Sequence, residues 1–241
     1  MRLGHRACWG LTLYPDAAEA GGCFLPTLRS RPTGGGAAAE PGRSQAEAAR
    51  RARAKLRRYC AANGLNRLWT LTYAGDGCFD PMELRSDLAG FFRGLRREVG
   101  AALPYAWVPE WHPGGHGLHV HFAADRFVRH ALVKDVWGRG IVHVKRIGSK
   151  ANRGDALERA RITAGYLAKY VSKSIDGERV PGLHRYEVAQ GFQPQRVPLR
   201  AATLEAVLAL ASERMGTLPR RRWESKDVEG WLGPPAYWYA W

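Results

Sequence analysis

Apolar residues along the chain follow two periods, one typical of strands and one typical of helices. Short segments that mix aliphatic, aromatic and β-branched residues predict strands over residues 67–73, 104–111, 117–125 and 140–148. Longer segments of strong helix formers predict helices over residues 44–60, 81–99, 129–138, 155–175 and 203–216. Ser44 and Asp80 are the expected N-caps of the first two helices.

The hexapeptide HPGGHG, residues 112–117, joins two of the predicted strands and is rich in turn-forming residues. It predicts a β-hairpin, so at least part of the sheet is expected to be antiparallel. Because the strands alternate with helices, the expected fold class is α+β, with a central antiparallel β-sheet flanked by helices.

The two ends of the chain have weaker patterns than the middle. RSRPTGGGAAAEPGRS, residues 29–44, has no helix or strand period. The expected organisation is a flexible N-terminal arm over 1–42, one core domain over 43–200, and a C-terminal helix with an aromatic tail over 201–241. A strand at CWGLTLY, residues 8–14, is the alternative within the arm. The tail is expected to pack back on the domain, and base stacking by its aromatic rings is the alternative.

The charge balance points to nucleic acid as the partner. The chain has 37 Lys and Arg against 22 Asp and Glu, a net charge of +15, and a pI near 10.2. A dense basic stretch on the first predicted helix is expected to contact DNA phosphates, and a merely solvated helical face is the alternative. Its members are Arg50, Arg51, Arg53, Lys55, Arg57 and Arg58.

Other classes of protein are not supported by the composition. No apolar run approaches the roughly 18 residues that a membrane-spanning helix needs. The N-terminus has no apolar segment of the kind found in secretory signals, so a cytoplasmic protein with no membrane partner is expected. The four cysteines form no CxxC pair and are expected to be reduced thiols.

The segment GLHVHF, residues 117–122, places two histidines in an apolar strand. Residues i and i+2 of a strand share a face, so His119 and His121 are expected to point together, away from their apolar neighbours. Two imidazoles at this spacing suit a metal ion, although HxH alone is also typical of two surface histidines.

Antiparallel pairing across the predicted hairpin places Glu110 opposite His119 and Trp111 opposite Leu118. Glu110 would then complete a His, His, carboxylate group that leaves other coordination positions open, as a catalytic Mg²⁺ or Mn²⁺ site requires. His112 and His116, in the loop, are the alternative ligands.

The helix segment AGYLAKYVSKS, residues 164–174, carries a second candidate group. At about 100° per residue its tyrosines and lysines fall on one face and its apolar residues on another. Tyrosines in the apolar core are the alternative. The separate face predicts nucleophilic phenols beside cations that stabilise the phenolate. The four candidate catalytic residues are Tyr166, Lys169, Tyr170 and Lys173.

Three ordered motifs resemble those of the HUH endonucleases, and within them the two-tyrosine initiators of rolling-circle replication in phages and plasmids. They are LWTLTY at 68–73, HVH at 119–121 and YLAKYVSK at 166–173. The resemblance implies the HUH nuclease fold with His119, His121 and an acidic or polar third ligand. Thr70 and Thr72 of the first motif are expected to contact DNA.

The resemblance also implies an activity. A tyrosine attacks a phosphodiester of single-stranded origin DNA, which leaves a 5′-phosphotyrosine and a free 3′-OH, and a later transfer rejoins strands. Either Tyr166 or Tyr170 can act first, with Tyr170 favoured if only one acts. No P-loop is present, so a host helicase and a polymerase are expected partners. A mobilisation relaxase, a single-strand transposase and a non-enzymatic, metal-stabilised DNA-binding module are the alternatives.

Overall fold

The computed structural model describes residues 7–26, 41–146, 156–176, 180, 182–231 and 234–241. For residues 41–49, 146, 156 and 170–176 only the backbone is described. Contacts divide the chain into two compact units, one formed by Met1–Ala39 with Pro194–Trp241 and the other by Glu40–Gln193. They are called the terminal unit and the central unit below.

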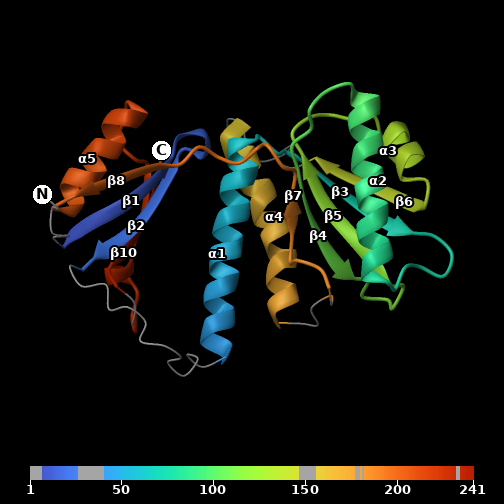
Figure 1. Cartoon of the computed structure of the whole chain (residues 1–241), viewed down its shortest axis with the longest axis horizontal. Coiled ribbons are helices and arrows are strands. Elements are labelled where there is room, and N and C mark those ends of the chain that lie inside the picture. Colours follow the sequence, from blue (N-terminus) through green and yellow to red (C-terminus); the bar gives the residue numbers. More distant parts are fainter. Residues whose placement is uncertain (1–6, 27–40, 147–155, 177–179, 181, 232–233) are drawn as a thin grey trace, which may run out of the picture. The chain divides into compact units, whose positions relative to one another are not determined.

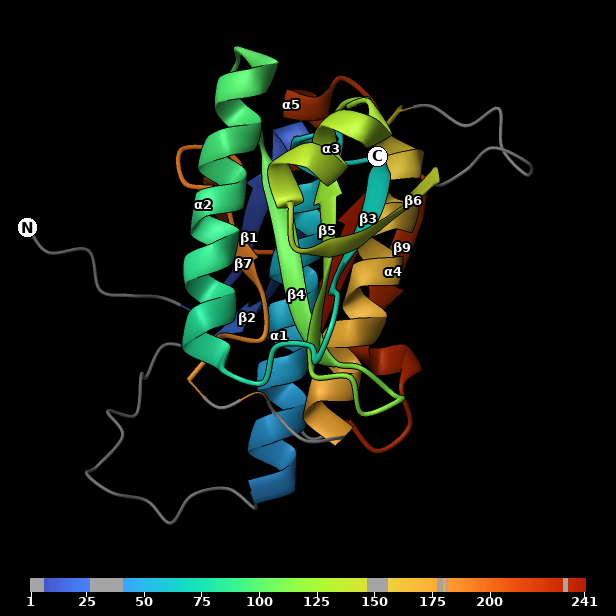
Figure 2. The ribbon, with the colours of Figure 1, turned by 90° about the vertical axis from the view of Figure 1, so that its right-hand side faces the viewer.

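The central unit is built on a five-stranded sheet whose paired strands are all antiparallel, in the order β6-β3-β5-β4-β7. Helices lie on both faces of this sheet (Figures 1 and 2). The strands are β3 (Arg67–Tyr73), β4 (Tyr105–Trp111), β5 (Leu118–Ala124), β6 (Gly140–Arg146) and β7 (Glu187–Val188), and the helices are α1 (Pro41–Ala62), α2 (Pro81–Val99), α3 (His130–Trp137) and α4 (Ala156–Asp176). The predicted fold class, a central antiparallel sheet flanked by helices, is confirmed.

Alternation along the strands produces two apolar cores, one on each face of the sheet. On one face, Val120 and Phe122 of β5 pack with Phe91 of α2 and Trp137 of α3. On the other face, residues of β3, β4 and β5 pack against α1 and α4, in a cluster that includes Leu56 of the first of these helices. Because helices cover both faces, all seven residues of β5 are buried.

The terminal unit has a second five-stranded antiparallel sheet, in the order β8-β1-β2-β10-β9. Helix α5 packs on one face of this sheet, where Leu11 and Leu13 join Val207 in one apolar cluster. Its elements are β1 (Cys8–Tyr14), the 3-10 turn η1 (Pro15–Ala17), β2 (Glu19–Leu25), β8 (Val197–Ala201), α5 (Leu204–Met215), β9 (Arg221–Glu224), the 3-10 turn η2 (Ser225–Asp227) and β10 (Ala236–Ala240).

The terminal sheet corrects the expected division at residues 42 and 200. Cys8–Leu25 form a hairpin inside a sheet and are not a flexible arm, while residues 27–40 lie outside the described residues. The glycines of β2 mislead a reading by composition, because they permit close strand packing: a Cβ on Gly22 would overlap the carbonyl oxygen of Gly10. The Tyr237 hydroxyl also donates to that carbonyl, at 2.5 Å.

The aromatic tail is part of the terminal sheet and does not form a separate surface. Tyr237, Tyr239 and Trp241 are all buried in its core. All four cysteines are free thiols, in agreement with the expectation from their spacing. None of the helices in the described part of the chain has an apolar stretch of the length needed to cross a bilayer.

The N-cap of α2 provides a test of the local structure. Asp80 has an extended backbone and its side chain accepts a hydrogen bond from the Met82 amide at 2.8 Å. Replacing it by alanine leaves that amide without its cap, so we expect Asp80→Ala to lower the free energy of unfolding by about 1 kcal/mol. Chemical denaturation of both proteins measures this loss. Asp76→Ala, in an exposed turn, is the control and should change stability little; an equal loss in both variants would contradict the capping role.

Candidate metal centre and tyrosine helix

The β4–β5 hairpin brings together the residues of the candidate metal centre. Its predicted register is confirmed, with Glu110 opposite His119 and Trp111 opposite Leu118. The loop closes through a hydrogen bond from the His112 amide to the Gly117 carbonyl, at 2.8 Å. Gly117 has a positive φ of 72°, and a side chain there would collide with the backbone of Cys78. Glycine at this position therefore lets the hairpin approach the loop before α2.

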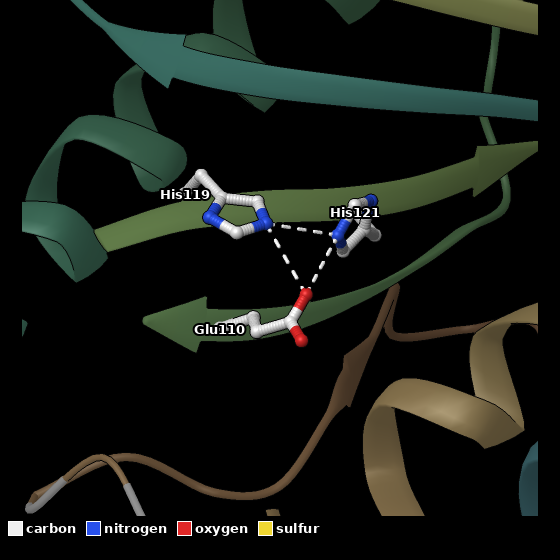
Figure 3. A group of neighbouring side chains, drawn as sticks. All are labelled: Glu110, His119 and His121. Atoms are coloured by element: carbon white, nitrogen blue, oxygen red, sulfur yellow. Dashed lines mark hydrogen bonds and ion pairs between the residues drawn. The ribbon is translucent and has the colours of Figure 1, made fainter. Parts of the chain in front are cut away.

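Three ligand atoms converge on the face of the sheet that α1 and α4 cover (Figure 3). His119 Nε2 and His121 Nε2 are 3.0 Å apart. Glu110 Oε2 lies 3.2 Å from His119 Nε2 and 3.1 Å from His121 Nε2. The two imidazoles are buried, with 5% and 7% of their residue surfaces exposed, and the carboxylate is partly buried. The chain therefore forms a compact triangle of two nitrogens and one oxygen that could hold a metal ion.

The size of this triangle fits a divalent cation. In an octahedron with metal–ligand distances of about 2.1 Å, neighbouring ligand atoms are about 3.0 Å apart. A tetrahedral zinc site with similar bond lengths has edges of about 3.3 Å. The observed edges of 3.0 to 3.2 Å lie nearer to an octahedral face. Three acceptor atoms at such short distances also repel one another unless a proton or a cation lies between them, so the donor set suits a bound ion.

Thr70 of β3 orients one of the imidazoles. Its hydroxyl lies 3.0 Å from His121 Nδ1, and the two residues are directly paired between β3 and β5. A proton on Nδ1 can be donated to this hydroxyl, which leaves the lone pair of Nε2 directed at the metal centre. His119 Nδ1 is buried and has no hydrogen-bond partner among the described residues. Thr72, opposite His119, is partly buried on the same sheet face.

The two loop histidines are engaged in other contacts and are not in the ligand group. His112 Nδ1 accepts a hydrogen bond from the Gly114 amide at 3.1 Å. His116 Nε2 lies 3.2 Å from the Tyr73 carbonyl oxygen. These contacts shape the hairpin loop, so the geometry favours Glu110 as the third ligand over either loop histidine.

Helix α4 separates an apolar face from a tyrosine and lysine face, as its periodicity predicts. Ala160, Ala164 and Leu167 are buried, whereas Tyr166 is partly buried and Lys169 is exposed. Tyr170 and Lys173 lie on the same helix, and their side chains are outside the described residues.

The ring of Tyr166 is flanked by two ammonium groups. Lys169 Nζ lies 4.9 Å from the ring centroid, and Lys145 Nζ, which comes from β6, lies 4.7 Å from it. Contacts of this kind are favourable cation–π interactions. Lys145 was not among the candidate residues predicted from the sequence. Only the pairing of β6 with β3 places it on the face of the sheet that α4 covers, because it lies opposite Leu68 of the α1 and α4 core.

Other tyrosines of the central unit are poor candidates for a nucleophile. Burial raises the pKa values of Tyr59, Tyr73, Tyr105 and Tyr186. For Tyr73 the hydrogen bond that its hydroxyl donates to Asp87 raises the pKa further. A phenol that is harder to ionise is a weaker nucleophile at neutral pH.

The basic residues of α1 are distributed around its buried stripe. Leu56, Tyr59 and Cys60 are buried, and the helix packs mainly against α4. Among the six basic residues predicted to bind DNA, Arg50, Arg51 and Lys55 are exposed and Arg53, Arg57 and Arg58 are partly buried. Their role in DNA binding stays a prediction.

Metal binding at the triangle can be tested by thermal unfolding. At a free Mn²⁺ concentration 100-fold above its dissociation constant, binding to the native state adds about 2.7 kcal/mol. For a chain of this size that corresponds to a rise of roughly 5 to 10 °C in the melting temperature. His121→Asn should abolish most of this rise because it removes one ligand. His143→Asn, on an exposed position of the same sheet face, should keep it. An equal rise in both variants would place the ion elsewhere.

The basic helix can be tested by the salt dependence of DNA binding. We expect replacement of Arg50, Arg51 and Arg53 by glutamine to weaken binding of a single-stranded oligonucleotide. The slope of log K against log salt should fall by about 2, since each lost phosphate contact on a single strand contributes about 0.7. Fluorescence anisotropy over a salt titration measures both changes.

A variant with the same loss of charge on α2 is the control for that experiment. Arg93, Arg96 and Arg97 are exposed on α2, and their replacement by glutamine should leave most of the slope intact. If the two triple variants lose the same slope, the effect is one of net charge and α1 has no special role.

Comparison with protein families matches a segment of just under half the chain. Residues 66–175 match the model of a family described as Replication-associated protein, of the ORF2 type. This segment runs from the residue before β3 to the end of α4 and contains the metal-ligand group and both tyrosines of α4. Neither the curated proteins nor the solved structures give a match. The part of the chain that forms the candidate site is thus similar to the replication-associated proteins of this family.

Proposed function

We propose that this protein is a replication initiator that cuts and rejoins single-stranded DNA in rolling-circle replication, by a metal-dependent tyrosine attack. The observation that carries the proposal is the convergence of Glu110, His119 and His121 within a segment that matches a replication-associated family. The two-tyrosine helix α4 follows in the same segment and supplies candidate nucleophiles.

The ligand group supports a catalytic role over a purely structural one. Three protein ligands on one side of an ion leave its other positions open to oxygens of a substrate. A divalent cation bound there would polarise a phosphodiester and stabilise the charge that develops on it. The residues of the chain hold this geometry through paired strands, which are rigid supports for a site.

Tyr166 is the proposed first nucleophile. A phenol with the usual pKa near 10 is only about 0.1% ionised at neutral pH, so its phenolate needs nearby positive charge. Lys145 and Lys169 supply two ammonium groups within 5 Å of the Tyr166 ring centroid. This proposal differs from the preference for Tyr170 that its spacing to two lysines suggests, because Lys145 comes from a distant strand.

The proposed reaction exchanges one phosphodiester for another. The Tyr166 oxygen loses its proton and attacks phosphorus in line with the bond to the 3′-oxygen. The new phenolic O–P bond forms as the P–O3′ bond breaks, and the leaving 3′-oxygen takes up a proton. The products are a 5′-phosphotyrosine and a free 3′-OH that can prime synthesis. A 3′-OH that later attacks this phosphotyrosine restores the DNA link and releases the phenol, and Tyr170 is available for a second cleavage.

The proposal predicts a covalent protein–DNA adduct. Labelled single-stranded oligonucleotides that tile the DNA around the coding gene, incubated with the protein and Mn²⁺, should give an adduct that survives denaturing electrophoresis. Tyr166→Phe should reduce the adduct of the first cleavage to background, since phenylalanine has no attacking oxygen. Tyr170→Phe is the matched control on the same helix and should retain it.

Two outcomes would contradict the proposed chemistry. One is an adduct that survives in the Tyr166→Phe/Tyr170→Phe double variant. The other is the absence of any adduct over the whole tiled region, which would favour a non-enzymatic DNA-binding module. Loss of the adduct in Tyr170→Phe alone would keep the chemistry and reassign the first nucleophile. Cleavage at a transfer origin or at the ends of a mobile element would instead identify a relaxase or a transposase.

A further inference from the structure

A pocket of about 630 Å³ lies beside β7, at the edge of the central sheet opposite β6. Its walls come from α1, α2 and the segment around β7. This volume is within the range of pockets that hold small ligands. None of the residues of the metal centre or the tyrosine face of α4 lines it, so the proposed reaction leaves its purpose unexplained.

The wall of the pocket around β7 is held firmly to the rest of the central unit. The Ala189 amide donates to the Tyr105 carbonyl at 2.9 Å, which continues the pairing of β7 with β4. The Tyr59 hydroxyl of α1 donates to the Ala189 carbonyl at 3.2 Å. Asn63 Nδ2 donates to the Phe192 carbonyl at 3.0 Å. These contacts fix the segment in place, so the pocket is preformed.

The charge of the lining favours an anionic ligand. Lys55 of α1, Arg85 of α2 and Arg185 contribute three positive charges, against the single carboxylate of Glu187. Lys55 and Arg85 are exposed, so a phosphate can reach both side chains from solvent. Lysine and arginine around a phosphate form charge-assisted hydrogen bonds.

Glu187 narrows the class of ligand further. Its Oε1 atom is buried and has no hydrogen-bond partner among the described residues. The nearest cation, Arg85 Nη2, is 3.8 Å away, which is beyond hydrogen-bond distance. A buried carboxylate oxygen is poorly stabilised without a donor. A ligand with an N–H group directed at Glu187 would supply that donor.

Tyr186 adds an aromatic surface to the same pocket. It is partly buried, so one part of its ring is held by the domain while another part lines the pocket. Aromatic side chains stack on nucleobases and bind single strands in this way. Positive charge for phosphate, a ring for stacking and a carboxylate that needs a donor together describe a nucleotide whose base has an amino group.

We infer that this pocket is a subsite for one nucleotide of single-stranded DNA and that it prefers cytosine to thymine. Glutamate accepts a hydrogen bond from the N4 amino group of cytosine, whereas thymine has an acceptor, O4, at the same position. The inference rests on the proposed function, because the bound nucleotide would belong to the strand that the metal centre cuts. Val188 lies opposite Ala106, four residues from Glu110 on β4, which is about 14 Å along the strand.

Binding measured without cleavage tests this subsite. Fluorescence anisotropy in EDTA would compare 12-mers of deoxycytidine, thymidine and deoxyuridine, the last to remove any effect of the thymine methyl group. We expect the full-length wild-type protein to bind the deoxycytidine 12-mer at least about fivefold more tightly than either of the others. Glu187→Gln should bring this ratio close to one, because an amide can accept from cytosine and donate to thymine.

Two control variants separate base recognition from charge. Glu98→Gln removes an exposed carboxylate of α2 outside the pocket and should keep the preference for cytosine. Lys55→Gln should weaken binding of all three oligonucleotides by a similar factor and lower the salt slope by about 0.7, as expected for one lost phosphate contact. Lys55 is exposed on its helix, so this second variant remains informative if Glu187→Gln does not fold.

Several outcomes would overturn the subsite. They are equal binding of the three 12-mers by the wild-type protein, a preference for cytosine that persists in folded Glu187→Gln, and unchanged affinity in Lys55→Gln. Competition by deoxycytidine monophosphate as strong as that by the 12-mer would indicate a free-nucleotide site and not a site for a strand. None of these readouts needs cleavage, so the subsite can fail while the tyrosine adduct is still formed, and the reverse is equally visible.

Discussion

The pairing of β4 with β5 is the constraint on which the candidate site depends. One register places Glu110 opposite His119, and the pleat of β5 places His121 on the same face. A shift of one residue would turn a ligand to the other face of the sheet. The register is maintained by a loop that closes between His112 and Gly117, and by the hydrogen bond from the Leu118 amide to the Cys78 carbonyl at 2.6 Å. The geometry of the metal centre is thus a property of backbone pairing before it is a property of side chains.

The rest of the central unit uses the two faces of that sheet for different purposes. The core with α2 and α3 is wholly apolar in its strand contributions and anchors β5 from one side. The core with α1 and α4 is interrupted by the imidazoles, and Thr70 links β3 to one of them. Lys145 and Tyr166 meet farther along this face, where β6 and α4 come together. Ligands and nucleophile are therefore supplied by elements that share one sheet face and come from separate parts of the sequence.

Much of the central unit can be predicted from local patterns. The strands at 67–73 and 104–124, the N-cap at Asp80 and the Glu110 register follow from alternation, capping residues and loop length, all of which act over a few residues. Lys145 could not be found in this way, because its neighbour Tyr166 depends on the pairing of β6 with β3. The terminal sheet was missed because β1 pairs with β8, nearly 190 residues away, and because the glycines of β2 resemble those of a loop.

The terminal sheet also has a consequence for the order in which the chain folds. β1 lies between β2 and β8, and β2 lies between β1 and β10, so both N-terminal strands need partners from the last 45 residues. A two-stranded hairpin alone is at best marginally stable in water. During synthesis, the first strands to leave the ribosome must therefore wait until almost the whole chain has followed. The central unit, whose strands all lie within residues 67–188, has its complete set of partners earlier.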